Sequence, residues 1–99
     1  MEEQELIRKL NSVGKQIFVE YFFTFQSFAN GQLSKENCIE LLVSNRVSNE
    51  NGAAIRCGNA TLIFNTKMEC RALEIVTEST RLPYNTVDNA QKIIDEYYG

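Results

Sequence analysis

The side chains of this chain that are best suited to acid–base or metal chemistry are carboxylates that occur in pairs. The pairs are Glu36/Glu40, Glu74/Glu78 and Asp95/Glu96. Two carboxylates on one helix face could share a proton or hold a cation. None of these pairs has a glycine-rich loop or an additional ligand beside it in the sequence. We therefore interpret them as solvated helix faces, and an acid-only enzyme would require folding to bring Glu20, Glu36 or Glu40 into one pocket.

The chain contains no histidine. This removes the commonest general base, the usual partner of a serine or cysteine nucleophile, and most zinc sites. Phosphate-binding loops, dinucleotide-binding fingerprints, nucleophile elbows and calcium loops are also missing from the sequence. We therefore expect no enzymatic activity, no catalytic residue, no metal site and no cofactor.

The three cysteines, Cys38, Cys57 and Cys70, are odd in number and lack the C-x-x-C spacing. Each lies in a helix-like stretch, so we expect reduced and mostly buried thiols. The first residues are acidic where a secretory signal would be basic, and no apolar run approaches the roughly 20 residues that span a bilayer. We therefore expect a cytoplasmic protein with no membrane partner.

Length and charge restrict the class further. A chain of 99 residues with 43% hydrophobic content predicts a single domain over residues 1–99. The net charge of −3 repels nucleic acid at long range, which makes nucleic acid an unlikely partner.

The chain must fold into helices, because its apolar residues recur at helical spacing. We predict an all-α bundle of about five helices with a long N-terminal helix that packs on the central third helix. The predicted segments are about Glu2 to Ala29, Lys35 to Ser44, Glu50 to Asn65, Lys67 to Glu78, and from Pro83 to about Tyr98. Ser34 is a natural N-cap, and Thr66-Lys67-Met68-Glu69 matches a capping box.

Five of the six phenylalanines lie between Phe18 and Phe28. On a helical wheel with Gln16 at zero, the apolar residues of this first segment share one broad face, but Val19 and Phe23 fall outside it, near about 300° and 340°. A single packed face cannot bury both. They need a second surface, which could be another helix of the chain, a second copy, or a different partner.

Two further residues are candidates for partner binding. Arg56 could anchor an acidic partner, although such an arginine more often extends to the surface or pairs with a nearby acid such as Glu50. Tyr98 could form an exposed aromatic hot spot with Tyr97. The plainer interpretation has Tyr97 docking the last helix and Tyr98 half exposed.

Two segments resemble known helical motifs. Residues 41–55 resemble a helix-turn-helix with Val47-Ser48 in the turn, but Arg46 stands where glycine is usual and Arg56 is the only strong phosphate or base reader on the second helix. Residues 56–83 are similar to one degenerate tetratricopeptide unit, without a second copy in the chain. We interpret both as ordinary packed helix pairs.

The resulting hypothesis is a small acidic protein-binding module without catalysis, of the accessory, inhibitor or antitoxin type. It would bind another protein or itself, as a homodimer, through Val19, Phe23, Arg56 and Tyr98. The alternative is a small helix-turn-helix DNA-binding regulator, whose DNA affinity would depend on salt and on Arg46 and Arg56.

Overall fold

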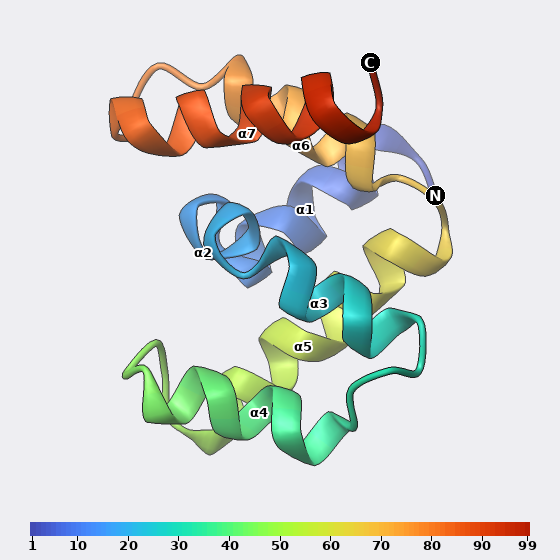
Figure 1. Cartoon of the computed structure of the whole chain (residues 1–99), viewed down its shortest axis with the longest axis vertical. Coiled ribbons are helices and arrows are strands. Elements are labelled where there is room, and N and C mark those ends of the chain that lie inside the picture. The colour runs from blue at the N-terminus through green and yellow to red at the C-terminus, as the bar shows by residue number, and fades with distance from the viewer.

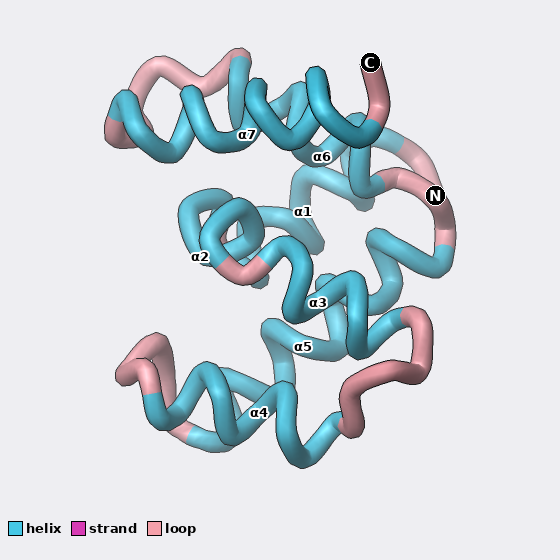
Figure 2. Tube along the Cα trace, in the orientation of Figure 1, coloured by secondary structure: helices cyan, strands magenta, loops and turns pink.

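The computed structural model describes all 99 residues and contains seven α-helices and no strand. The helices are α1 (Glu3–Val13), α2 (Lys15–Glu20), α3 (Phe22–Ala29), α4 (Lys35–Ser44), α5 (Glu50–Asn65), α6 (Glu69–Thr77) and α7 (Tyr84–Tyr97). Short loops join them (Figure 2). The prediction of an all-α fold is confirmed, whereas the prediction of about five helices is not.

The helices form three tiers along the longest axis of the molecule (Figure 1). The pair α6 and α7 lies at one end, α1 to α3 lie in the middle, and α4 lies at the other end. Helix α5 packs against α1, α3, α4 and α6, so it connects all three tiers. Both termini lie on the same side of the molecule in this view.

The predicted long N-terminal helix is wrong, because the first segment breaks at two places. Gly14 separates α1 from α2 with φ of 95° and ψ of 120°, and Tyr21 separates α2 from α3 with φ of −108°. A continuous helix from Glu2 to Ala29 would be about 42 Å long, whereas the longest extent of the molecule is 31 Å. The two breaks fold the segment back, and α1 and α3 thereby both pack on α5.

The core is one cluster of 19 buried apolar residues. Its centre is aromatic: Phe18, Phe22 and Phe25 have at most 1% of their surface exposed. The ring of Phe64, on α5, lies 5.9 Å from the ring of Phe18 and 5.0 Å from that of Phe22. The phenylalanine-rich segment thus joins the N-terminal helices to the central helix.

Side-chain caps define the start of two helices. The Ser34 hydroxyl accepts a hydrogen bond from the Asn37 amide at 3.1 Å, and the Asn49 side chain accepts one from the Gly52 amide at 2.8 Å. These local bonds satisfy amides that the first turn leaves free. The predicted bounds of α4 and α5 agree with the structure for this reason.

The predicted capping box at Thr66 to Glu69 is wrong. The Thr66 hydroxyl instead donates to the carbonyl groups of Leu62 and Ile63, at 2.8 and 3.2 Å, at the end of α5. Lys67 follows in the left-handed region with φ of 60°, and the Met68 amide bonds back to the Ile63 carbonyl. This is a C-terminal capping arrangement, so Thr66 ends α5, and α6 begins later, at Glu69.

Candidate protein-binding surface

Three exposed aromatic side chains, Phe23, Tyr97 and Tyr98, come together from α3 and from the end of α7. We refer to them as the aromatic patch. Their exposed fractions are 45%, 58% and 37%. The ring of Phe23 lies 5.2 Å from the ring of Tyr97 in an edge-to-face arrangement, which is a favourable geometry for two aromatic rings.

A buried ring supports the aromatic patch from below. Phe22 lies 5.3 Å from Phe23 and 6.5 Å from Tyr98, both edge to face. Phe22 itself packs on Phe64 in the core. The Tyr98 hydroxyl also donates to the Glu69 carboxylate at 3.2 Å. The patch therefore rests on the core and on α6, and its rings have little freedom to lose on binding.

Burial raises the pKa of the Tyr98 phenol to about 12, with smaller contributions from the charge and the hydrogen bond of Glu69. The ordinary pKa of a tyrosine is about 10. Since the folded pKa is the higher one, the neutral phenol stabilises the fold fully below about pH 10, and this contribution is lost as the pH rises towards 12.

We therefore expect Tyr98 to be the last tyrosine to ionise when the ultraviolet absorbance is followed against pH. Tyr98→Phe should remove the step near pH 12 and leave the earlier steps in place. A titration curve whose last step survives this substitution would contradict the assignment.

Val19, predicted for partner binding, lies inside the protein. Only 6% of its surface is exposed, and it belongs to the core cluster. Helix α2 packs on α7, and Val19 shares a shallow hollow with Asn85, Thr86 and Asn89 of that helix. The second surface that Val19 requires is thus supplied by the chain itself.

Arg56 lies apart from the aromatic patch. Its guanidinium group donates to the Val13 carbonyl at the end of α1, and the added Cβ of an alanine at Gly14 would lie 3.1 Å from its Nη1 atom. No carboxylate lies within ion-pair distance, so the pair with a nearby acid such as Glu50, one of the two plainer interpretations, does not form. The positive charge instead meets the negative end of a helix dipole, which ties α5 to α1.

The plainer interpretation, in which Tyr97 docks the last helix, is wrong, because 58% of the Tyr97 surface is exposed. The buried residues of α7 are Thr86, Ala90 and Ile93, and Tyr97 continues the same face by helical spacing. It is, however, the last residue of the helix, where its ring lies against the exposed ring of Phe23. The adjacency of Tyr97 and Tyr98 at the end of the chain was the available signal.

The acids that could have formed an enzyme pocket lie in different places on the surface. Glu36, Glu40 and Glu50 line a shallow groove of about 280 Å³ on α4 and α5, and all three are exposed. Glu20 lines other hollows. The acids that an acid-only enzyme would require, Glu20, Glu36 and Glu40, therefore do not meet in one pocket. No group of three or more histidine, cysteine or acidic side chains is placed to hold a metal ion.

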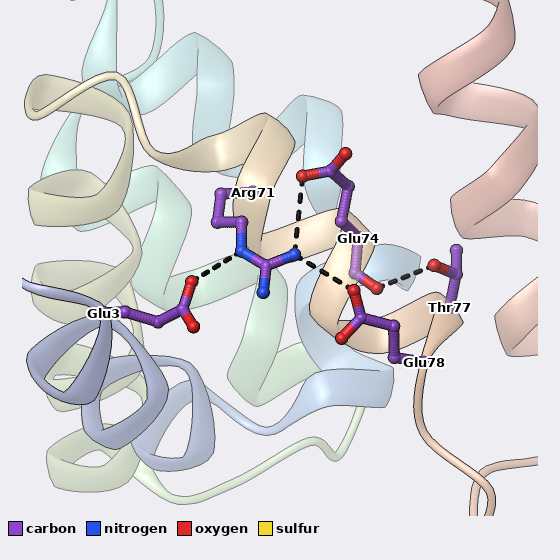
Figure 3. A network of polar contacts seen from close by, with 5 residues as sticks. All are labelled: Glu3, Arg71, Glu74, Thr77 and Glu78. Atoms are coloured by element: carbon purple, nitrogen blue, oxygen red, sulfur yellow. Dashed lines mark hydrogen bonds and ion pairs between the residues drawn. The ribbon is translucent and has the colours of Figure 1, made fainter.

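Glu74 and Glu78 belong to an ion-pair network around Arg71 (Figure 3). The Arg71 Nε lies 2.6 Å from the Glu3 carboxylate, and its Nη1 lies 3.0 Å from that of Glu78 and 3.5 Å from that of Glu74. The hydrogen bond and the charge of Arg71 lower the pKa of the Glu3 carboxyl. The network links α1 to α6.

None of the seven helices combines the length and the apolar composition that crossing a bilayer requires. Comparison of the chain with family models, curated proteins and solved structures found no match. The geometry of the surface is therefore the basis for a functional proposal.

Proposed function

We propose that this protein acts without catalysis, by binding protein, and that the aromatic patch is the centre of the binding surface. The observation that supports this is the edge-to-face pair of Phe23 and Tyr97, which stays exposed although the buried ring of Phe22 holds it in place. Exposed aromatic rings on a rigid base are typical of interface hot spots, because they bury large areas at a small cost in conformational entropy.

The partner we propose is a second copy of the chain. A two-fold interface brings the same patch from both copies together. The uncharged rings of Phe23 and Tyr97 in one copy would then pack against the same rings of the other copy. A stable interface buries about 800 Å² on each partner. The three rings would form its centre, and neighbouring residues of α3 and α7 would form the rim.

The test is the absolute mass in solution, measured by light scattering over a range of protein concentrations at moderate salt. The wild type should form a dimer, and Phe23→Glu should weaken the dimer at least about tenfold, since it places a charge at the centre of the interface. Because Phe23 is 45% exposed, the helix content should change little.

Ile55→Glu is the matched control, because Ile55 is 57% exposed and lies on α5. It introduces the same charge and should leave the dimer intact. A wild type that stays monomeric at every concentration would contradict the homodimer. A dimer that is lost in Ile55→Glu and kept in Phe23→Glu would move the binding surface to α5.

We do not propose DNA binding as a second function, because no observation favours it. The exposed residues of α5 are Glu50, Asn51, Ile55, Leu62 and Asn65, none of them basic. Arg56, on which base or phosphate contact would depend, is engaged with the Val13 carbonyl. A DNA affinity that falls steeply with salt and with loss of Arg46 and Arg56 would reverse this choice.

A further inference from the structure

Two cysteine side chains meet inside the protein at the contact of α4 with α5. The Sγ atoms of Cys38 and Cys57 are 2.9 Å apart, and both residues are fully buried. Cys70 lies on α6, is partly exposed, and makes no such contact. The sequence gives no spacing signal for this pair, because 19 positions separate the two residues.

We propose that Cys38 and Cys57 form a redox-convertible pair, which a peroxide or a disulfide oxidant turns into a disulfide that links α4 to α5. The two sulfur atoms need to approach by about 0.9 Å from their 2.9 Å separation to reach the length of a disulfide bond, about 2.05 Å. Both residues lie in regular helices that already pack on each other.

The hydrogen bond between the two thiols couples their ionisation. It lowers the pKa of Cys57, to which the charge of Lys35 also contributes, and it raises the pKa of Cys38, with burial as the next cause. Either sulfur can be the donor, and the bond breaks when α4 moves away from α5. Either thiolate can therefore react first; when Cys57 does, Cys38 resolves the product.

With hydrogen peroxide the reaction balances in two steps. The Cys57 thiolate attacks one peroxide oxygen; an S–O bond forms, the O–O bond breaks, and the hydroxide that leaves takes the Cys38 proton to give water. The Cys38 thiolate then attacks the sulfenic sulfur of Cys57; the S–S bond forms and the S–O bond breaks. The second hydroxide takes up the proton that Cys57 first released, so two thiols and one peroxide yield one disulfide and two waters.

The oxidant reaches the pair when α4 opens. Helix α4 lies at the end of the molecule (Figure 1) and packs mainly on α5 and α3. Its displacement would uncover Cys38 and Cys57, while the aromatic core between α3 and α5 could stay in place. Peripheral helices open locally at a lower free energy than the whole fold, so we expect the rate of oxidation to follow this opening.

The test uses the full chain, treated with hydrogen peroxide, followed by counting of free thiols in denaturant. The count should fall from the three thiols of the reduced chain to one, the mass should fall by two hydrogens, and peptide mapping should join Cys38 to Cys57. The oxidised chain should also unfold at a higher urea concentration, since the crosslink restricts the unfolded state.

Three variants make the outcome decisive. Cys70→Ala should keep the intramolecular disulfide, whereas Cys38→Ala and Cys57→Ala should lose it. Refolding from denaturant in a mixture of reduced and oxidised glutathione lets the disulfide form without the oxidant having to reach the buried thiols. The proposal would be overturned if three free thiols remained after both treatments, or if the oxidised thiol were Cys70 instead of the Cys38 and Cys57 pair.

Discussion

Replacing Phe18 with alanine is expected to lower the free energy of unfolding by about 3–5 kcal/mol. Phe18 is fully buried, and its ring lies 5.6 Å from Phe22, 6.4 Å from Phe25 and 5.9 Å from Phe64. Truncation removes the ring and leaves a cavity where α2, α3 and α5 meet. Since small domains are stable by only about 5–15 kcal/mol, the variant should be close to unfolding. Urea denaturation followed by circular dichroism measures the loss.

Phe23→Ala is the matched control for this prediction. The same side chain is removed five positions later, but Phe23 is 45% exposed, and the aromatic rings beside it are those of Phe22 and Tyr97. We expect a loss of about 1 kcal/mol or less. Equal losses at the two positions would mean that Phe23 is a core residue, and would contradict both the burial pattern and the proposed function.

The features that the sequence predicted correctly depend on neighbouring residues. Ser34, the predicted N-cap, accepts from the Asn37 amide three positions away. The predicted start of α5 at Glu50 agrees with the structure, where Asn49 caps the helix through the Gly52 amide. The helical wheel likewise separated Phe23 from the buried face of its segment, because burial on one side of a helix follows from residue spacing alone. Phe23 is indeed exposed, whereas its role in binding remains a prediction.

The features that the sequence did not predict depend on residues far apart. Arg56 bonds to the Val13 carbonyl across 43 positions, and Cys38 meets Cys57 across 19 positions. No local pattern encodes either contact. The burial of Val19 was not predicted for the same reason. It depends on contact between α2 and α7, and the position of α7 is set by tertiary packing.

The error at Thr66 has a different origin. A threonine before a helix and a threonine at the end of the preceding helix have the same sequence signature when the connecting turn is short. The hydroxyl can accept from amides that follow or donate to carbonyls that precede it. Here it donates to Leu62 and Ile63, and Lys67 adopts the left-handed conformation, which is uncommon for a residue other than glycine and is not readily predicted from sequence.

Gly14→Ala is expected to lower the free energy of unfolding by about 1–3 kcal/mol. Gly14 has φ of 95° and ψ of 120°, a conformation that residues with a Cβ rarely adopt. The new Cβ would lie 3.1 Å from the Arg56 Nη1 and 3.3 Å from the Ile17 Cδ1. The substitution therefore strains the backbone and presses on the arginine that ties α5 to α1. Urea denaturation of the variant measures the loss.

Gly58→Ala supplies a control of opposite sign. Gly58 lies within α5, and an added Cβ would meet no atom within 4 Å, so the variant should gain about 0.5–1 kcal/mol from better helix propensity. The difference in sign separates backbone strain at Gly14 from any general effect of alanine. If Gly14→Ala stabilised the protein instead, α1 and α2 would form one continuous helix about 27 Å long. The bend at Gly14, which lets α1 pack on α5 while α2 packs on α7, would then be lost.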